Sequence, residues 1–227
     1  MTEFYNGEEK LLVAVDSIIF GFKDGKLKLL IGKRIVEPGA GMWSLYGGFV
    51  RINEDLEEAA RRVLYQYTGI KDIFMQQVGA FGKVNRDPGD RVVSVAYCAL
   101  INVDDYDTSL LDKYGLIWAD LDNLPEMWGD HKEMINKSLN QLRHQISTEP
   151  LSFNLLPDLF TLTQLQNVYE AIIGHEVDKR NFRKRIKQMD FIEKTSLIDK
   201  VTSKRGASLY RFNKKAYDSD GEHSFKL

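Results

Sequence analysis

The sequence predicts an α+β protein of two domains, a larger one at residues 1–150 with a mixed sheet and a smaller one at residues 151–227. Segments typical of strands and of helices alternate through the first part, whereas the second begins with helical segments. The charge also changes sign, since residues 1–150 carry 17 Lys plus Arg against 23 Asp plus Glu and residues 161–217 carry 13 against 6. This asymmetry favours different partners, with a polyanion facing the basic domain. An unevenly charged single domain is the alternative.

The composition restricts the class of protein. Of the 227 residues, 43% are hydrophobic and 28% are charged, which is ordinary for a globular protein and excludes bulk disorder. The longest apolar run, residues 92–101, is too short to span a bilayer, and the N-terminus has no signal-like apolar block. The single cysteine, Cys98, lies in that run and is expected to be a buried thiol in a reducing compartment. We therefore expect a cytoplasmic protein without a membrane partner.

The first domain is expected to contain four strands and two helices. Strands are predicted at residues 11–22, 27–34, 76–81 and 91–103, and helices at residues 55–67 and 130–146. The first two strands are joined by a turn with Asp24 and Gly25, a pair that favours a tight hairpin. Gly69 is expected to end the first helix, and Asp130 to open the second through a capping box with Glu133. The last strand is apolar enough to be buried at the centre of a sheet.

The second domain is expected to fold as a winged helix-turn-helix. Residues 163–173 have helical apolar spacing, and Gly174 is expected to end this helix. Asp178 is expected to cap a second helix that reaches about Met189. The buried stripe of that helix is Phe182, Ile186 and Met189. The remaining elements are two short strands at residues 197–201 and 208–212, which flank a basic turn.

The basic surface of the second helix suits duplex DNA, because Arg and Lys reach phosphates and guanine edges from a helix in the major groove. Asn181 adds an amide that can pair with adenine. The expected DNA-binding residues are Lys179, Arg180, Asn181, Arg183, Lys184 and Lys187 on the helix and Lys204 and Arg205 at the hairpin tip. Any one of these charges alone is usually a solvated surface residue, but a turn, a basic helix and a basic wing together indicate DNA binding. A non-catalytic RNA-binding adaptor is an alternative.

Another motif lies in the first domain. A glycine, five residues, a glutamate, seven residues and an arginine are followed by a Gly-Ile pair, and this spacing resembles the Nudix box. The matching positions are Gly48, Glu54, Arg62, Leu64, Gly69 and Ile70. The box has glutamate at three further positions, where this chain has Val63, Gln66 and Tyr67. The resemblance implies that the first domain is a Nudix-like α/β/α sandwich with a mixed sheet.

The three departures decide the chemistry expected of this domain. Nudix hydrolases cleave a diphosphate with Mg²⁺ held by those glutamates, and an apolar side chain, an amide and a phenol supply no charge for the ion. Glu57 and Glu58 lie about two turns too early in the helix to replace them. We therefore expect no catalytic residue, no metal and no cofactor, and we expect Glu54 and Arg62 to form a bracing ion pair. The alternative is a hydrolase that acts on ADP-ribose or another nucleoside diphosphate derivative with unconventional carboxylates.

A Nudix-like domain without these glutamates, followed by a basic winged helix, resembles the Nudix-related transcriptional regulators. The resemblance extends over residues 128–131, 155–157, 160–170 and 178–183. It implies that the first domain senses a small-molecule effector and that the second binds operator DNA as part of a homodimer. Within the family the chain resembles the arabinose-responsive AraR branch most. L-arabinose is therefore the expected effector, and regulation of sugar utilisation is the expected role. Because other members of the family sense ADP-ribose, that branch is the alternative, and the sequence leaves open whether the chain represses or activates.

The cleft in which a Nudix substrate would lie is the candidate effector pocket. Its expected lining residues are Lys33, Arg34, Trp43, Tyr46, Arg86 and Arg91. A sugar site needs a flat aromatic face and several hydrogen-bonding side chains, and this set contains both. The alternative for Trp43, as for Trp118 and Trp128, is a place in the core or in an interface. His131 is expected to be an ordinary residue of a first helical turn.

Overall fold

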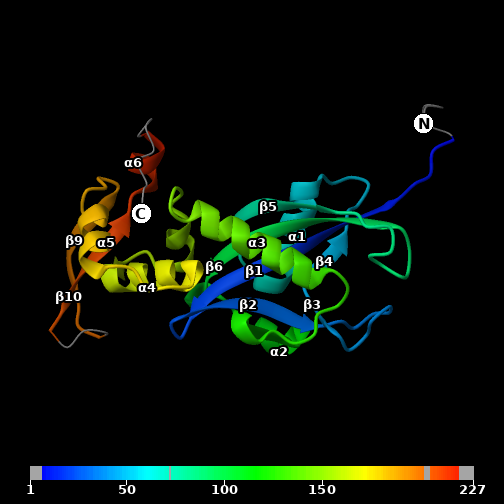
Figure 1. Ribbon diagram of the computed structural model, residues 1–227, viewed down its shortest axis with the longest axis horizontal. Coiled ribbons are helices and arrows are strands. Elements are labelled where there is room, and N and C mark those ends of the chain that lie inside the picture. Colours follow the sequence, from blue (N-terminus) through cyan, green and yellow to red (C-terminus); the bar gives the residue numbers. More distant parts are fainter. Residues whose placement is uncertain (1–6, 72, 202–204, 220–227) are drawn as a thin grey trace.

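The computed structural model describes residues 7–71, 73–201 and 205–219. In these ranges no helix is long and apolar enough to cross a membrane. The molecule is elongated, with a mixed sheet and its helices at one end and a small second domain at the other (Figure 1). The predicted order of the two parts is therefore confirmed.

A seven-stranded mixed sheet forms the centre of the first domain. Its strands are β1 (Leu12–Lys23), β2 (Lys26–Lys33), β3 (Trp43–Ser44), β4 (Tyr46–Phe49), β5 (Phe74–Phe81), β6 (Val92–Asn102) and β7 (Leu116–Asp120). The order is β3-β2-β1-β6-β5, with β4 paired to β1 and β7 paired to β2. Strands β1 and β6 run parallel, whereas β2 and β4 pair with β1 in the antiparallel sense. Asp24 and Gly25 both have positive φ, 53° and 74°, as the predicted hairpin turn requires.

Helices cover both faces of this sheet. They are α1 (Leu56–Thr68), α2 (Ser109–Tyr114) and α3 (His131–Gln145), with the 3-10 helices η1 (Val103–Asp105) and η2 (Leu121–Asn123). Because side chains alternate along a strand, Val15 and Ile19 of β1 belong to the cores beneath α1, while Ile18 and Phe20 belong to the core beneath α3. Figure 1 shows α3 lying across one face of the sheet. The predicted α/β/α sandwich is confirmed.

The second domain is a winged helix-turn-helix, as predicted. Its elements are η3 (Leu151–Leu155), β8 (Phe160–Thr161), α4 (Leu162–Ile173), α5 (Lys179–Ile186), β9 (Ile192–Asp199), β10 (Ala207–Phe212) and α6 (Lys214–Ser219). Thr161 and Gln164 form a capping box at the start of α4, and Gly174 ends this helix with a φ of 83°. Asp178 caps α5 by accepting the backbone N–H of Asn181 at 2.7 Å. These local signals were readable in the sequence because each acts within one helical turn.

The two domains share one hydrophobic cluster. Leu142 and Ile146, at the end of α3 and just beyond it, belong to the same cluster as Leu165 and Ile172 of α4. Arg143 adds a polar contact, since its Nε donates a hydrogen bond to the carbonyl oxygen of Ile172 at 2.9 Å. Helix α3 therefore packs on the sheet along its length and on the second domain at its C-terminal end.

Several local predictions were wrong. Helix α5 ends at Ile186 and not near Met189, although Met189 is buried as expected. Asp130 precedes α3 but makes no capping hydrogen bond with its side chain, because that carboxylate is bound by Arg86. The first wing strand runs over residues 192–199 and not over residues 197–201. Strands β3, β4 and β7 and helix α2 were not predicted, because short elements carry too few residues to show a period.

Candidate ligand pockets and nucleic-acid interface

One pocket of the first domain, the tyrosine pocket, has a volume of about 640 Å³. It lies where the end of β2, strands β3 and β4, the last turns of α1 and the end of α2 meet. Its lining residues are Gly32, Lys33, Arg34, Ile35, Val36, Trp43, Ser44, Leu45, Tyr46, Gly47, Gln66, Tyr67, Lys113, Tyr114 and Gly115. The volume is sufficient for a ligand of nucleotide size.

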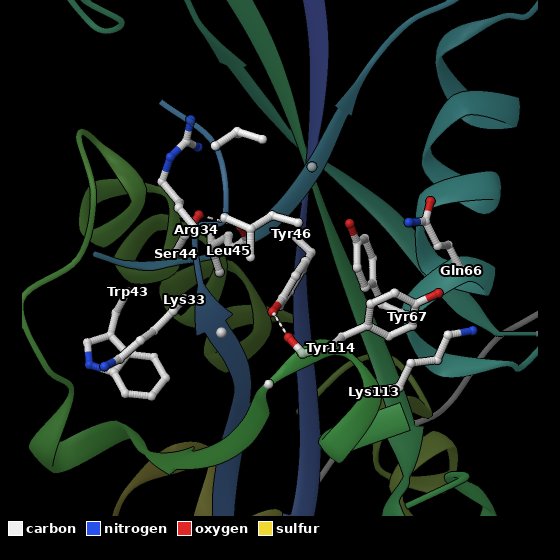
Figure 2. A pocket seen from close by; sticks show the side chains of 15 residues that line it. Lys33, Arg34, Trp43, Ser44, Leu45, Tyr46, Gln66, Tyr67, Lys113 and Tyr114 are labelled. Atoms are coloured by element: carbon white, nitrogen blue, oxygen red, sulfur yellow. Dashed lines mark hydrogen bonds between the residues drawn. The ribbon is translucent and has the colours of Figure 1, made fainter. Parts of the chain in front are cut away.

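Three tyrosine rings form one wall of this pocket. The ring centroids of Tyr46 and Tyr67 are 4.1 Å apart, and those of Tyr67 and Tyr114 are 5.0 Å apart. The Tyr46 hydroxyl donates a hydrogen bond to the Tyr114 carbonyl oxygen at 3.1 Å (Figure 2). Gly32 makes room for this ring, because a Cβ atom there would overlap the Tyr46 hydroxyl. Burial raises the pKa of Tyr46 to about 12, so this phenol stays neutral at physiological pH.

Basic side chains flank the tyrosines. Lys33 lies on one side of Tyr46 and Lys113 on the other (Figure 2). The Lys33 ammonium is 5.4 Å from the centroid of the Trp43 ring, and the Lys113 ammonium is 4.9 Å from that of Tyr114. Neither lysine forms an ion pair with another described residue, and the lining contains no carboxylate. The pocket is therefore aromatic and electropositive.

The three residues of α1 that stand in place of the Nudix-box glutamates lie in different surroundings. Val63 is buried against the sheet, Gln66 is exposed at the rim of the tyrosine pocket, and Tyr67 is half-buried in its wall. Within the described ranges, no group of three or more His, Cys, Asp or Glu side chains is arranged to hold a metal ion. The Mg²⁺ that a Nudix hydrolase uses therefore does not fit the residues of this helix.

The retained part of the Nudix box has the bracing role that the sequence predicted. Arg62 binds Glu54 through two hydrogen bonds, Nε to Oε2 at 2.9 Å and Nη2 to Oε1 at 2.5 Å. Nη2 also donates to the carbonyl oxygen of Phe49 at 3.1 Å. The hydrogen bond from Arg62 is the main cause that lowers the pKa of Glu54 to about 2. These contacts tie the loop after β4 to α1.

A smaller pocket, the Asp16 pocket, has a volume of about 260 Å³ and adjoins the first. Its lining residues are Ala14, Asp16, Arg34, Val36, Leu45, Gly47, Gly48, Phe49, Arg86, Asp87, Val92, Trp128 and His131. Arg34, Val36, Leu45 and Gly47 line both pockets. The guanidinium of Arg34 lies 4.9 Å from the centroid of the Trp128 ring, and its Nε donates to the Pro38 carbonyl oxygen at 3.0 Å. Arg34 is thus fixed at the junction of the two pockets.

A buried polar network forms the floor of the Asp16 pocket. Arg86 binds both carboxylate oxygens of Asp130 at 2.9 Å and lies 3.6 Å from the carboxylate of Asp16. Asp16 also accepts the hydroxyl hydrogen of Ser94 at 2.6 Å. These side chains hold one another in fixed positions, so they are preorganised to hydrogen-bond a polar ligand.

His131 belongs to this network, which corrects the expectation of an ordinary first-turn residue. It is buried, and its Nδ1 accepts the backbone N–H of Leu45 at 3.0 Å. Its Nε2 lies 3.8 Å from a carboxylate oxygen of Asp16. Burial is the main cause that lowers the pKa of His131, so the ring is neutral at physiological pH. Because His131 is the first residue of α3, this helix begins at the pocket floor.

The structure brings five of the six expected effector residues to the two pockets. Lys33, Arg34, Trp43 and Tyr46 line the tyrosine pocket, and Arg86 lines the Asp16 pocket together with Arg34. Arg91 lines neither, because its guanidinium donates to the carbonyl oxygens of Gly82 at 3.0 Å and Val92 at 3.3 Å. The sequence analysis missed Asp16, Tyr67, Lys113, Tyr114 and Trp128 as lining residues. One of these residues could have been found from the sequence, because Tyr67 stands where the Nudix box has a glutamate.

The second domain presents a basic helix. The exposed residues of α5 and its end are Lys179, Arg180, Asn181, Lys184, Arg185 and Lys187. Arg183 is half-buried, and its Nη2 donates to the Thr163 hydroxyl of α4 at 3.0 Å, so its place in the DNA interface stays a prediction. This hydrogen bond connects the two helices. Arg205 is exposed at the wing, whereas Lys204 lies outside the described residues.

Both domains of the chain match known protein families. The profile of the NUDIX domain matches residues 10–137, and that of the NrtR DNA-binding winged helix domain matches residues 152–212. The ADPR responsive transcriptional repressor NtrR of Acinetobacter baylyi is 36% identical over 211 residues, which cover 91% of this chain and 84% of that protein.

Two solved structures agree with these matches. Shewanella oneidensis NrtR complexed with a 27mer DNA has a TM-score of 0.81 at 27% identity, covering 90% of this chain and 94% of that one. The NUDIX domain of the same NrtR complexed with ADP ribose has a TM-score of 0.51 at 26% identity, covering 63% and 99%. Neither of these two proteins is described as arabinose-responsive, so the expected AraR link and arabinose effector are not supported.

Proposed function

Since this chain belongs to the Nudix-related transcriptional regulators with an NrtR-type winged helix, we propose that it represses transcription and that ADP-ribose releases it from DNA. The family and the winged helix make it a DNA-binding regulator with a Nudix effector domain. The observation that carries the effector proposal is the pair of adjoining pockets with different chemistry. One is aromatic and electropositive, and the other has a polar, hydrogen-bonded floor.

The two pockets match the parts of ADP-ribose. The tyrosine wall offers flat faces on which an adenine ring can stack. The carboxylate of Asp16 and the guanidinium of Arg86 can hydrogen-bond ribose hydroxyls on the other side of Arg34. L-arabinose has neither a flat base nor a charge, so it would leave the aromatic wall and the basic side chains unmatched. Chemical complementarity therefore favours the nucleotide over the sugar.

Helix α3 provides a route from this site to the DNA-binding domain. Its first residue, His131, hydrogen-bonds the pocket backbone, and the preceding Asp130 binds Arg86. Near its other end, Arg143 donates a hydrogen bond to the carbonyl oxygen of Ile172 in the last turn of α4. A ligand that engages Arg86 or Asp16 changes the forces on the start of α3 and thereby the placement of α4. Effector and DNA then weaken each other by the same factor, about 5–150-fold for a coupling of 1–3 kcal/mol.

The proposal includes the absence of hydrolysis. Val63 and Gln66 carry no charge, and burial raises the pKa of Tyr67, so none of the three supplies a carboxylate for Mg²⁺. We expect no release of AMP from ADP-ribose in the presence of Mg²⁺ or Mn²⁺. Turnover at about 1 per second or faster, an ordinary enzyme rate, would overturn this part of the proposal and favour the hydrolase alternative.

The proposed repressor acts as a homodimer on a near-palindromic duplex. The recognition helices of two copies would enter successive major grooves, which sets the half-sites about one helical turn, or a multiple of it, apart. Selection of binding sequences from a random duplex library tests this arrangement. We expect inverted repeats with that spacing, whereas unrelated single sites would argue for a monomer.

A direct test uses fluorescence anisotropy of the full chain bound to the selected duplex. ADP-ribose is titrated at fixed salt, with L-arabinose, ribose and AMP as comparison ligands. We expect ADP-ribose to release the duplex and the two sugars to leave it bound. Release by L-arabinose with no effect of ADP-ribose would refute the proposed effector. The matched variants are Tyr46→Ala, which removes part of the aromatic wall, and Tyr65→Ala, which changes an exposed tyrosine of α1 outside the pocket.

A further inference from the structure

The tyrosine pocket occupies the place where the Nudix box normally presents metal-binding glutamates, yet its charge has the opposite sign. Gln66 and Tyr67 line it from α1, while Lys33, Arg34 and Lys113 supply three positive charges and the lining contains no Asp or Glu. Positive charges at a site repel a divalent cation and attract an anion. This inference rests on the proposed function and concerns the way in which the diphosphate of the effector is held.

The three basic side chains come from two segments of the chain and line one pocket. Lys33 ends β2, Arg34 follows it, and Lys113 lies near the end of α2. Figure 2 shows Lys33 and Arg34 on one side of Tyr46 and Lys113 with Gln66 on the other. An anion that lies across Tyr46 can therefore receive hydrogen bonds from both sides.

These side chains are available for a ligand. Lys33, Arg34 and Lys113 each lie against an aromatic ring, at 5.4, 4.9 and 4.9 Å from its centroid. Among the described residues none of them has a carboxylate within ion-pair distance, in contrast to Arg62 and Arg86. The aromatic contacts orient the cations without neutralising them, so no internal ion pair has to break when an anion binds.

We propose that Lys33, Arg34 and Lys113 bind the diphosphate of a nucleoside diphosphate sugar directly and that this site works without Mg²⁺. The phosphate oxygens accept hydrogen bonds from the two ammonium groups and the guanidinium. A metal-binding carboxylate surface has thus been replaced by a cationic one, and the same cleft binds a diphosphate that it does not cleave. The neutral tyrosines contribute stacking surface and hydroxyl groups, and no metal ligand.

The test is calorimetric titration of the full chain with ADP-ribose, once in EDTA and once in excess Mg²⁺. We expect the dissociation constants to agree within about twofold. Lys33→Gln and Lys113→Gln should each weaken ADP-ribose binding about tenfold or more, since each removes a charge-assisted hydrogen bond. The matched control is Lys71→Gln, because Lys71 also lies against a tyrosine, Tyr65, but outside the pocket.

Adenosine and inorganic pyrophosphate separate the diphosphate site from the rest of the ligand. We expect Lys33→Gln and Lys113→Gln to leave adenosine binding unchanged and to weaken pyrophosphate binding in EDTA. Loss of adenosine binding in these variants would mean that they damage the pocket and would count against the assignment. Unaltered melting temperatures exclude a failure to fold, which is not expected of two exposed lysines.

The outcomes distinguish this inference from the proposed function. Binding of ADP-ribose that disappears in EDTA and returns with Mg²⁺ would overturn the direct site and leave the effector intact. Wild-type affinity for ADP-ribose in both Lys33→Gln and Lys113→Gln would overturn it as well. If ADP-ribose binds neither in EDTA nor in Mg²⁺, the proposed effector is wrong. Pyrophosphate then still tests the anion site, because a failure of pyrophosphate to bind in EDTA would refute it.

Discussion

The two domains use their basic side chains in opposite ways. In the first domain Arg62 pairs with Glu54, and Arg86 pairs with Asp130 and approaches Asp16. The described part of the second domain contains an exposed ion pair of Arg211 with Glu193, and the basic side chains exposed on α5 form no ion pair with another described residue, although this part of the chain carries the positive excess. Paired charges fix the structure, whereas unpaired ones gathered on one surface indicate a site for an anion from outside the chain.

The same contrast recurs within the first domain. Lys33, Arg34 and Lys113 remain unpaired among the described residues and gather around one pocket, as the basic residues of α5 gather on one helix surface. A single rule therefore indicates the operator surface and the diphosphate site. The following variants test this rule, from the largest expected effect to the smallest.

Arg86→Met should cause the largest loss of stability. Arg86 is 6% exposed in its side chain, and its removal leaves the carboxylates of Asp130 and Asp16 without their cation. We expect the free energy of unfolding to fall by about 3–5 kcal/mol, measured by urea denaturation. Lys83→Met is the matched control, since the pair of Lys83 with Glu133 is exposed and should contribute little to stability. Equal losses for both variants would contradict a structural role for the buried pair.

Arg180→Ala should weaken DNA binding without affecting the fold. The side chain is exposed on α5, so we expect a loss of about 1–3 kcal/mol in operator affinity if it reads a base. The melting temperature should stay the same, because no contact within the protein is lost. Binding is measured by anisotropy with the selected duplex at fixed salt.

Arg183→Ala sharpens this comparison on the same helix. Its guanidinium is bound to Thr163 of α4, so we expect a lower free energy of unfolding, by about 1 kcal/mol, before any specific loss of base preference. Thr163→Val removes the same hydrogen bond from the other side and should behave alike. A loss of sequence preference with unchanged stability would restore the original assignment of Arg183 as a reading residue.

The smallest expected effect concerns pH. The pKa of Glu54 is lowered to about 2 in the folded chain, below its ordinary value of 4.5, because Arg62 stabilises the carboxylate. The stabilisation is therefore complete above about pH 4.5 and is lost as the pH falls toward 2. Wild type and Glu54→Gln should differ in unfolding free energy at pH 7, and this difference should narrow below about pH 4.5 and disappear only as the pH falls through 2. A difference that is independent of pH would mean that the ion pair is not its source.

Much of the fold follows from local sequence signals. The Asp24-Gly25 turn, the capping box at Thr161 and the glycine that ends α4 each depend on residues within one turn. The long strands and helices also have enough residues to show a hydrophobic period. Helix α2 and strand β7 do not, and consequently Lys113 and Tyr114 were absent from the expected pocket.

The parts of the site that could not be predicted depend on contacts between distant segments. Arg86 meets Asp130 across 44 residues of chain, and Arg183 finds Thr163 on the preceding helix. Local periodicity says nothing about such partners, so both arginines were taken as free to bind a ligand or DNA. The expected L-arabinose effector is not supported by the comparisons, and the sequence alone is a weak guide to a ligand, because the identity of a ligand follows from the shape and charge of an assembled pocket.

The central claim is that one effector site and one DNA surface are coupled, and reciprocity tests it most directly. The dissociation constant of ADP-ribose is measured for the free protein and for the protein saturated with the selected duplex, at the same salt concentration. We predict that DNA weakens ADP-ribose binding by the same factor by which ADP-ribose weakens DNA binding, about 5–150-fold. Equal affinities of ADP-ribose for the free and the DNA-bound protein would contradict the account.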